Sequence, residues 1–385
     1  MKISARISSA RPLATTAMHG RAESLKAEGK QLIDFSIAVS HFAAPQAVVD
    51  AVRAGLDQHP TLPYTTVSGA LPLRRSLAAK LRRENAIEAA PQEIIVTNGA
   101  KQALYEALYV LTDPGDPVIV FAPYWPAYRA TIELLGLHPV YVDLPDTLTA
   151  AGFDRWPQVK LVILNNPHNP SGKVFAAAEL AALADWMTAN GAGAIVDESY
   201  EHLVFEGRHI SLAATCDWRA AGVVTLFSAS QSYGMMGWRA GFALAPEPVI
   251  AAMETLQGPI TAAPAALSQI ACDAAFAGGP SRAMLDDYCM RRDLAVGLFA
   301  GLPWIDMASP HSGPYVWGDV RRLTHDTLAF AEGLLAQEGV AIMPGEALGQ
   351  AGWIRLGYIS DDVATLREGI RRIAAFGNAL AAARP

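Results

Sequence analysis

Leu161-Val162-Ile163-Leu164 and Ala194-Ile195-Val196 are short apolar runs rich in β-branched residues, and a helical pattern over 178–190 lies between them. Gly191 follows the helical pattern, at the position where many helices end on a left-handed glycine. A strand, a helix and a second strand in this order form a βαβ unit, whose two strands run parallel. This stretch therefore predicts an α/β fold.

The same alternation continues on both sides of this unit. Further strand patterns occur at 93–97, 117–121, 223–227 and 241–244. Continuous β-rich runs that alternate with helical patterns are typical of a largely parallel sheet covered by helices on both faces. Later strand patterns at 315–317 and 353–356 stand among long helical patterns, which predicts a second, smaller α/β domain.

These patterns divide the chain into three parts. We expect residues 1–44 to form an N-terminal arm and part of the small domain. Residues 45–254 are expected to form the large domain, and residues 255–385 an interdomain helix followed by the C-terminal small domain. A chain of 385 residues is long enough for two or three domains of ordinary size.

Composition limits the kinds of partner. The chain has 30 Lys and Arg against 37 Asp and Glu, a formal net charge of −7, which argues against a nucleic acid or an anionic membrane as its main partner. We expect no membrane span, because no continuous apolar run reaches about 18 residues. Cys216, Cys272 and Cys289 are widely spaced and form no disulfide or zinc pattern. We therefore expect a cytoplasmic protein without a metal site.

Residues that could bind a ligand, most of them polar, follow five of the predicted strands. In open α/β sheets, ligands bind at the carboxyl ends of the strands, so we expect these residues to meet at one edge of the sheet. They are, strand by strand, Gly99, Ala100 and Lys101; Tyr124 and Trp125; Asn165, Asn166, His168 and Asn169; Asp197 and Tyr200; and Ser228, Ser230 and Gln231. Their convergence predicts a binding site.

The first of these groups suits an anion. A helix that begins at Gly99-Ala100-Lys101 offers free N–H groups and a positive dipole end to a phosphate, although a Gly-Ala pair after a strand is often only a tight turn. Ser228, Ser230 and Arg239 could add hydroxyl and guanidinium donors. GxxxxGK[ST] and GxGxxG are both absent, so the pattern is neither a P-loop nor a dinucleotide fingerprint.

The other groups suit an aromatic, cationic ring. Asp197 could pair with a protonated ring nitrogen, or it could cap a helix. Trp125 could lie on an aromatic ring or fill the core. Asn169 could donate to a phenolic oxygen or serve as a turn residue before Pro170. Their joint arrangement favours the functional interpretation over the structural one.

Three longer sequence motifs resemble those of a known protein family. They are Asn166-Pro167-His168-Asn169-Pro170-Ser171-Gly172, then Asp197-Glu198-Ser199-Tyr200, then Ser228-Ala229-Ser230-Gln231-Ser232-Tyr233-Gly234-Met235-Met236-Gly237-Trp238-Arg239. They strongly resemble the motifs of class I/II aminotransferases, and most of all those of the bacterial aspartate/prephenate/aromatic aminotransferase branch. The resemblance covers nearly the whole chain, from Tyr64-Thr65-Thr66-Val67-Ser68-Gly69 to Pro344-Gly345-Glu346-Ala347 and Arg355.

The resemblance implies a fold, a cofactor and a reaction. The fold is that of a fold type I PLP-dependent transferase, an α/β protein with a mostly parallel sheet covered by helices and a smaller α/β domain. The cofactor is pyridoxal 5'-phosphate (PLP), or pyridoxamine phosphate (PMP) or an external aldimine held non-covalently. The reaction moves an amino group between an α-amino acid and a 2-oxo acid, in amino acid metabolism and biosynthesis. Family members are homodimers with shared active sites, so we expect a homodimer.

The resemblance also assigns roles to individual residues. The residues implied to hold the cofactor are Tyr64, Gly99, Ala100, Lys101, Trp125, Asn169, Asp197, Tyr200, Ser228, Ser230 and Arg239, with Tyr64 reaching across from the partner subunit. Those implied to contact the substrate are Ala38, Lys101, Trp125, Asn169 and Arg355. Within these sets, Trp125 stacks on the ring, Asp197 pairs with its nitrogen, and Asn169 and Tyr200 bond its phenolic oxygen.

Two of the implied substrate contacts bear on the substrate class. Arg355 is expected to bind the α-carboxylate, because a planar guanidinium matches two carboxylate oxygens. Lys101 either reaches the distal carboxylate of an acidic substrate, as a lysine does here in some relatives, or only attracts phosphate or stands solvated at the start of a helix. The segment Ala38-Val39-Ser40-His41 departs from the Gly-Glu-Pro-Asp usual in the family, which indicates an unusual substrate or reaction.

Position 231 breaks the family pattern, because Gln231 stands where the family has a lysine. The implied catalytic positions are Gln231, Asp197 and Tyr200. The family's lysine condenses with PLP and later moves the proton of the substrate, whereas an amide has no nucleophilic nitrogen and no usable pKa. We expect strong impairment, since loss of the acid–base role alone costs roughly 10²–10⁴-fold. His168 and Tyr200 could move protons in principle, but neither is an obvious replacement.

Three functions remain open on the sequence. The first is an aminotransferase in which Gln231 is an inactivating substitution. The second is a naturally lysine-less PLP enzyme that carries out elimination, cyclisation or oxidation on an amino acid. The third is a non-catalytic protein that binds PLP or PMP. The otherwise intact motifs favour the first, whereas the unusual residues at 38–41 favour a repurposed site.

Overall fold

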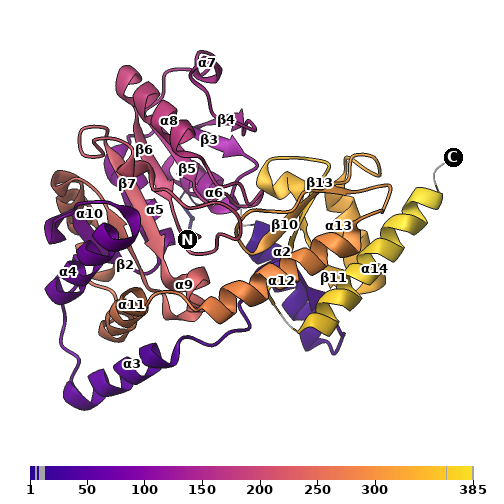
Figure 1. Ribbon diagram of the computed structural model, residues 1–385, viewed down its shortest axis with the longest axis horizontal. Helices are drawn as coiled ribbons and strands as arrows, with labels where there is room; N and C mark the ends of the chain where they lie inside the picture. Colours follow the sequence, from indigo (N-terminus) through magenta and orange to yellow (C-terminus); the bar gives the residue numbers. More distant parts are fainter. Residues whose placement is uncertain (5–6, 8–13, 361, 384–385) are drawn as a thin grey trace.

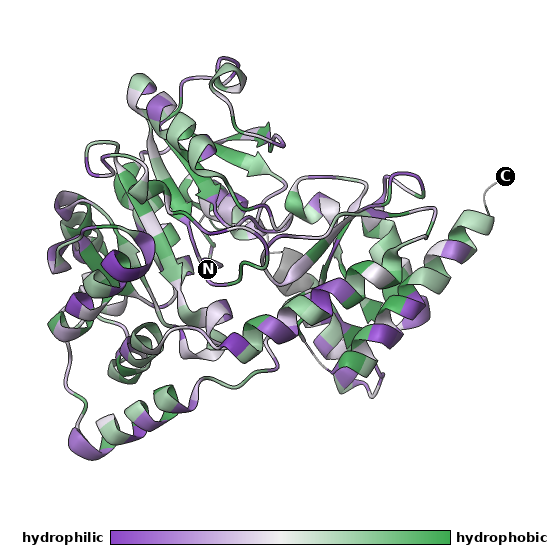
Figure 2. Ribbon diagram, in the orientation of Figure 1, coloured by the Kyte–Doolittle hydropathy of each residue, from purple (hydrophilic) through white to green (hydrophobic). Residues whose placement is uncertain are grey.

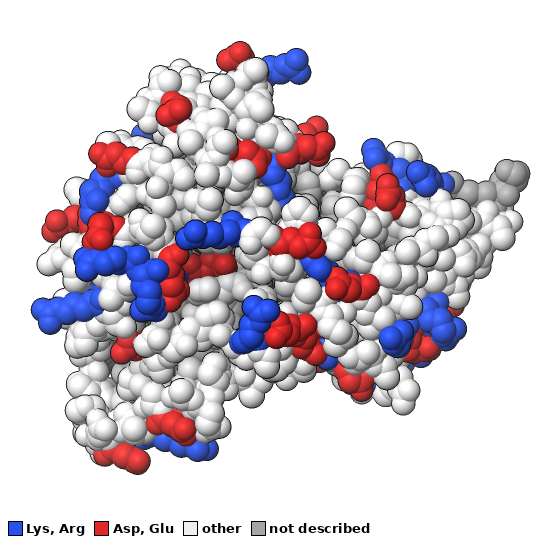
Figure 3. Space-filling view, in the orientation of Figure 1, with Lys and Arg blue, Asp and Glu red and all other residues white. Residues whose placement is uncertain are grey.

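The computed structural model describes residues 1–4, 7, 14–360 and 362–383 (Figure 1). The stretches 5–6 and 8–13 of the expected N-terminal arm therefore lie outside the described residues. Within the described part, no helix combines the length and the apolar character that a membrane span requires. On the face drawn in Figure 3, acidic and basic side chains are interspersed.

A sheet of seven strands, counted over the described residues, forms the centre of the larger body. Its order is β2 (Ile94–Thr97), β8 (Gly241–Leu244), β7 (Val223–Ser228), β6 (Gly193–Asp197), β5 (Leu161–Asn165), β3 (Pro117–Ala122) and β4 (His138–Asp143). All neighbouring pairs are parallel except those that include β8, which runs opposite to both β2 and β7. The α/β fold with a largely parallel sheet is thus confirmed.

Helices cover both faces of this sheet (Figure 1). One face packs on α5 (Ala100–Leu111), α6 (Pro126–Leu135) and α10 (Glu247–Thr261). The other packs on α4 (Leu71–Lys80), α8 (Ala177–Asn190) and α11 (Ala266–Gly278), with α3 (Gln46–Gln58) lying against α11 and the short α7 (Ala150–Phe153) against α8. Successive residues of β2 point to opposite cores, Ile94 and Val96 to one and Ile95 to the other. Because both faces are buried, the strands read as continuous apolar runs.

A second core belongs to the part of the chain that follows α11. It contains a sheet of four strands, counted over the described residues, in the order β12 (Met343–Pro344), β13 (Trp353–Gly357), β10 (Tyr315–Asp319) and β9 (Asp306–Met307). Its helices are α12 (Arg282–Phe299), α13 (Thr327–Glu338) and α14 (Val363–Ala382), and α2 (Ala14–Ala27) lies against β11. Both bodies show hydrophobic interiors in Figure 2.

The N-terminal segment joins this second body. β1 (Ile33–Asp34) pairs in parallel with β11 (Val340–Ala341), and Phe35 packs in the same core as Phe376. At the other boundary, Cys272 and Phe276 of α11 pack in the core of the large sheet. The division at 1–44, 45–254 and 255–385 remains a prediction.

Candidate active site

A cavity of about 460 Å³ lies at the carboxyl ends of the parallel strands. It is lined by Ala100, Lys101, Trp125, Tyr128, Asn165, Asn169, Asp197, Ser199, Tyr200, Ser228, Ser230, Gln231, Met236, Arg239 and Tyr315. These residues follow β2, β3, β5, β6 and β7, with Tyr315 contributed by the second body. The convergence that the sequence predicts is therefore present in the structure.

One end of the cavity is built to receive an anion. The guanidinium of Arg239 donates to the carbonyl oxygens of Met236, at 2.9 Å, and of Asn98, at 3.1 Å. Gly99 has a φ of +77°, and a Cβ added there would lie 2.6 Å from Nη2 of Arg239. Only glycine permits both this conformation and this approach. Gly99 thus makes room for a cation beside the first turn of α5, where helix N–H groups have no intrahelical acceptor.

Neighbouring side chains add to this anion-binding end. The hydroxyl of Ser228 accepts a hydrogen bond from the backbone N–H of Ser230 at 3.1 Å, so both residues are held at the start of α9 (Ala229–Ser232). Lys101 is exposed overall, but its ammonium lies 5.2 Å from the centre of the Trp125 ring. Partial burial, together with the nearby charge of Arg239, lowers the pKa of Lys101. Two cations therefore flank the hydroxyls at this end.

Asp197 lies at the floor of the cavity, at the end of β6. Its carboxylate accepts hydrogen bonds from the hydroxyl of Ser199 at 2.6 Å, the backbone N–H of Ser199 at 3.1 Å and the phenol of Tyr128 at 2.8 Å. All three donors are neutral, and burial raises the pKa of Asp197. A buried carboxylate that borders a cavity and has only neutral donors is best stabilised by a cationic group on the ligand.

A second guanidinium, that of Arg355, lies beside the cavity and contacts two of its lining residues, Asn169 and Tyr315. Arg355 of β13 is 1% exposed and lies 4.0 Å from the centre of the Tyr315 ring. It donates to the side-chain oxygen of Asn169 at 3.2 Å and to the carbonyl of Ser36 at 2.9 Å. Asn169 in turn donates to the phenolic oxygen of Tyr200 at 3.3 Å. Nε of Arg355 is buried and has no partner among the described residues.

Gln231 links the anion-binding end of the cavity to the segment that contacts Arg355. Its side-chain Nε2 donates to the carbonyl oxygen of Ala38 at 3.1 Å. Ala38 is buried and stands two residues from Ser36, which contacts Arg355. Oε1 of Gln231 is buried and has no hydrogen-bond partner among the described residues. The position that breaks the family pattern is thus inside the cavity, with one unused acceptor.

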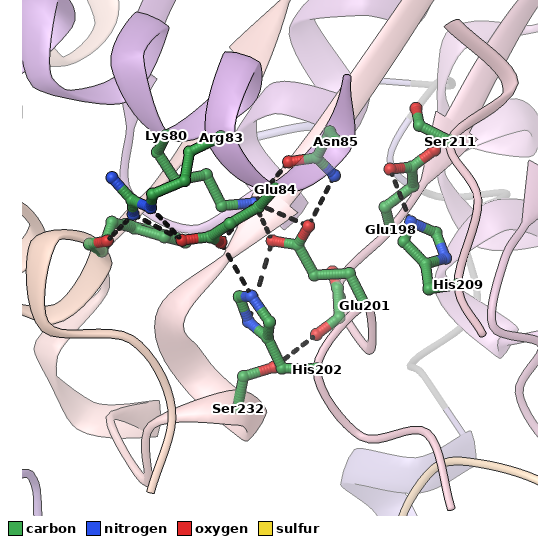
Figure 4. A network of polar contacts seen from close by, with 12 residues as sticks. Lys80, Arg83, Glu84, Asn85, Glu198, Glu201, His202, His209, Ser211 and Ser232 are labelled. Atoms are coloured by element: carbon green, nitrogen blue, oxygen red, sulfur yellow. Dashed lines mark hydrogen bonds and ion pairs between the residues drawn. The ribbon is translucent and has the colours of Figure 1, made fainter. Parts of the chain in front are cut away.

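A polar network lies behind the turn that follows β6 (Figure 4). Asp197 and Tyr200 line the cavity, whereas Glu198 and Glu201 belong to the network. Glu198 accepts from the hydroxyl of Ser211 at 2.7 Å and lies 3.0 Å from Nε2 of His209. The charge of Glu198 raises the pKa of His209 against the opposing effect of burial.

Lys80 is the centre of the other half of this network. Its Nζ lies 2.5 and 2.6 Å from the carboxylate oxygens of Glu201, and it also donates to Asn85 of the π-helical turn η1 (Leu81–Asn85) at 2.8 Å. Glu84 lies 3.5 Å from Lys80 and 3.0 Å from His202. Lys80 is 1% exposed and is not among the residues that line the cavity. Its ammonium is committed to Glu201, so it does not replace the lysine missing at 231.

Most of the predicted site residues are brought together. Eleven of the residues that the sequence predicts line the cavity: Ala100, Lys101, Trp125, Asn165, Asn169, Asp197, Tyr200, Ser228, Ser230, Gln231 and Arg239. Gly99, Ala38 and Arg355 contact this set through Arg239, Gln231 and Asn169. Tyr64 is 97% exposed and does not border the cavity of its own chain, and Tyr124, Asn166 and His168, which were also expected at this edge, do not line the cavity either.

Neither His168 nor Tyr200 is suited to carry the proton in place of a lysine at position 231. His168 lies outside the lining of the cavity, its Nδ1 is 2.8 Å from the hydroxyl of Ser171, and burial lowers its pKa to about 3. Burial raises the pKa of Tyr200 well above its usual value, so this phenol keeps its proton at neutral pH.

Sequence reasoning assigned no role to four cavity residues, Tyr128, Ser199, Met236 and Tyr315. Two of them carried a local signal. Tyr128 follows Trp125 by three positions at the start of α6, and Ser199 follows Asp197 by two, in a turn where a short hydroxyl side chain readily bonds an aspartate. Tyr315 carried none, because its place depends on how β10 sits against the large sheet.

Comparisons with known proteins are consistent over the whole chain. Residues 30–373 match the family described as "Aminotransferase class I and II". An aspartate aminotransferase of Geobacillus stearothermophilus is 32% identical, over 97% of this chain and 98% of that protein. A probable aspartate/prephenate aminotransferase of Thermus aquaticus is 34% identical, over 97% and 98%. Among solved structures, the aspartate aminotransferase of Thermus thermophilus with maleate has a TM-score of 0.91 at 32% identity, covering 98% of this chain and all of that one.

Proposed function

Because the chain belongs to the class I and II aminotransferase family, we propose that it carries the binding apparatus for transfer of an amino group between an α-amino acid and a 2-oxo acid, but lacks the acid–base group at position 231. The observation that supports this most is the cavity itself. It brings an anion-binding end, a buried carboxylate and Gln231 into one space, and its lining residue Asn169 contacts a second guanidinium, that of Arg355.

The donor set fits the family's cofactor, PLP. Asp197 is a buried carboxylate without a cationic partner among the described residues, and a protonated pyridine nitrogen would supply one. Gly99 leaves space that a Cβ would fill, beside Arg239 and the first turn of α5, where a phosphate can be held. When bound, PLP supplies an aldehyde that takes up an amino group and a ring that accepts electrons from the substrate.

Each end of the cavity then has a binding task in this proposal. Ala100, Ser228, Ser230 and Arg239 would hold the phosphate, and Trp125 would cover the ring. Asn169 and Tyr200 would donate to the phenolic oxygen. Arg355 would bind the α-carboxylate of the amino acid, because its Nε has no partner among the described residues and can donate to a ligand.

An acidic amino acid is the proposed substrate class. Lys101 borders the cavity. Because backbone N–H groups already serve the phosphate, the ammonium of Lys101 is available for the distal carboxylate of a substrate. The relatives named above are aspartate or aspartate/prephenate aminotransferases, and one was solved with maleate, a dicarboxylate. The segment Ala38-Val39-Ser40-His41 remains the feature that sets this pocket apart from the family pattern.

Gln231 limits what the chain does with a bound substrate. A carboxamide neither forms a covalent link with an aldehyde nor takes a proton from a carbon at neutral pH. We infer that binding survives and that turnover falls by at least the roughly 10²–10⁴-fold attributable to acid–base catalysis.

Single-turnover spectroscopy tests this proposal. The protein as given and its Gln231→Lys variant are each loaded with PLP and mixed with aspartate. The lysine variant is expected to convert PLP to PMP, and the protein as given to bind PLP and stall. If both proteins fail to bind PLP, the site is not a cofactor site. If only the glutamine form turns over, the protein is a lysine-less PLP enzyme with another reaction, and the aminotransferase proposal is wrong.

A non-catalytic cofactor-binding role is the second candidate. The observation in its favour is the hydrogen bond from Gln231 to Ala38, which gives the glutamine a fixed place in an otherwise complete cavity. It predicts that PLP or PMP binds tightly, but that neither the protein as given nor Gln231→Lys converts one into the other.

We also propose that the protein is a homodimer with shared active sites. Tyr64 is almost fully exposed and lies outside the cavity of its own chain, as expected of a residue that completes the phosphate site of a partner. Sedimentation velocity of the full chain is expected to give a dimer. The Tyr64→Phe variant is expected to bind PLP more weakly and to remain a dimer. A monomer that binds PLP with unchanged affinity after Tyr64→Phe would contradict this proposal.

A further inference from the structure

We propose that Gln231 makes this cavity select the amine form of the cofactor, so that PMP binds more tightly than PLP. The inference rests on the proposed cofactor site and adds to it a function for the residue that breaks the family pattern. It concerns non-covalent recognition only, and it requires no bond to form between the protein and the ligand.

The orientation of the Gln231 carboxamide is fixed by its partner. The carbonyl oxygen of Ala38 can only accept a hydrogen bond, so the NH₂ group of Gln231 must face it, as it does at 3.1 Å. Turning the amide over would place two acceptors against each other. Oε1 therefore faces away from Ala38, as an acceptor and nothing else.

This acceptor is unsatisfied. Oε1 is buried and has no donor among the described residues, although it belongs to a side chain that lines the cavity. A buried polar atom without a partner costs free energy, and a ligand that offers a donor recovers it. Among the described residues, every other unpaired buried side-chain atom of this kind belongs to a residue outside the cavity lining, so Gln231 is the lining residue that retains an unused buried acceptor.

The position of Gln231 brings this acceptor to the middle of a bound ligand. On one side it adjoins Ser230, at the anion-binding end. On the other side it bonds Ala38, two residues from Ser36, which contacts Arg355. A bound ligand would have its phosphate at the anion-binding end and its carboxylate near Arg355. The atoms between these two groups would then lie next to Gln231.

The two forms of the cofactor differ in hydrogen-bonding character at that point. The primary amine of PMP donates, and it does so strongly when it is protonated. The aldehyde oxygen of PLP only accepts, so it faces Oε1 as a second acceptor. A lysine at 231 reverses this relationship, because its nitrogen is a donor and it condenses with the aldehyde.

Equilibrium binding of the two forms tests the inference. The full chain, freed of bound cofactor, is titrated with PLP and with PMP, and the same is done for Gln231→Met, which keeps the length but removes the acceptor, and for Gln231→Glu, which strengthens it. Gln46→Met, a change of an exposed glutamine on α3, is the matched control. Borohydride treatment followed by mass spectrometry shows whether PLP has attached to Lys101 or another lysine.

We expect the ratio of the Kd of PLP to that of PMP to be about tenfold or more in the protein as given, from a hydrogen bond to a charged donor. The ratio should fall to about one in Gln231→Met, rise in Gln231→Glu and stay unchanged in Gln46→Met. Equal affinities in the protein as given, or a ratio that Gln231→Met leaves unchanged, overturns the inference while the cofactor site stands. If neither form binds, the proposed function fails as well.

Discussion

Lys80 and Glu201 form an ion pair in the interior of the protein, with Nζ 2.5 and 2.6 Å from the two carboxylate oxygens. Glu201 adjoins Tyr200, which lines the cavity, and Lys80 lies 4.8 Å from the centre of the Phe227 ring, next to Ser228. The ion pair therefore packs against the segments that contain the cavity residues Tyr200 and Ser228, on the side away from the cavity. Burial of the charges is compensated by Asn85, which bonds both partners.

Lys80→Met should destabilise the protein by about 3–5 kcal/mol, because it leaves the carboxylate of Glu201 buried without its cation. The double change Lys80→Met with Glu201→Leu should recover much of that loss, since no buried charge then remains unpaired. Urea unfolding measures both. Lys30→Met, which removes an exposed pair with Glu28, is the control and should change stability by less than about 1 kcal/mol. Equal effects at positions 80 and 30 would contradict the assignment.

Gly99→Ala should weaken PLP binding by about tenfold, because the new Cβ would lie 2.6 Å from Nη2 of Arg239 at a φ of +77°. Arg239 must then move away from the phosphate end of the cavity. Absorbance titration with PLP gives the affinity. Gly297→Ala is the control, because a Cβ at this position in α12 meets no atom within 4 Å. Unchanged affinity in Gly99→Ala would show that Arg239 does not hold the phosphate.

Lys101→Met, made in the Gln231→Lys background so that turnover is measurable, should raise KM for aspartate by about tenfold or more and leave KM for alanine nearly unchanged. The reason is that only aspartate carries the distal carboxylate that the ammonium of Lys101 would bind. Steady-state kinetics with both amino acids gives the comparison. A loss of PLP affinity without any change in amino acid preference would instead assign Lys101 to the phosphate.

Glu106 should make stability depend on pH. It is buried on α5, where it accepts one hydrogen bond from Gln102 at 2.7 Å, and burial raises its pKa to about 7 from an ordinary 4.5. The folded state therefore holds this proton more tightly than the unfolded state does. Its contribution is complete below about pH 4.5 and is lost as the pH rises through 7.

The Glu106→Gln variant checks this prediction. It stays neutral at every pH, so the decline in unfolding free energy between pH 5 and 8, on the order of 3 kcal/mol in the protein as given, should become shallower by that amount. Denaturant unfolding across this range measures the slope. An exposed change, Glu247→Gln, should leave the slope as it is. If Glu106→Gln also leaves it unchanged, Glu106 is already charged in the folded state.

Several parts of the fold could be predicted because their signal is local. β5, α8 and β6 were expected from apolar runs and from Gly191, which ends α8 with a φ of +66°. β4 was missed, because it is an edge strand of partly exposed residues that begins His138-Pro139, without a continuous apolar run. The strand pattern at 93–97 began one residue early, since Glu93 belongs to a 3₁₀ turn and bonds Arg219.

The sequence by itself determined which chemical groups stand at the ends of the strands, and that position 231 offers an amide in place of an amine. These follow from residue identity and from the rule that parallel strands end at one edge of a sheet. Only the tertiary structure decided where those groups point. Gln231 faces Ala38 across 193 positions, and Lys80 is committed to Glu201 across 121, because packing of separate elements, not local sequence, sets which polar atoms meet and which are left for a ligand.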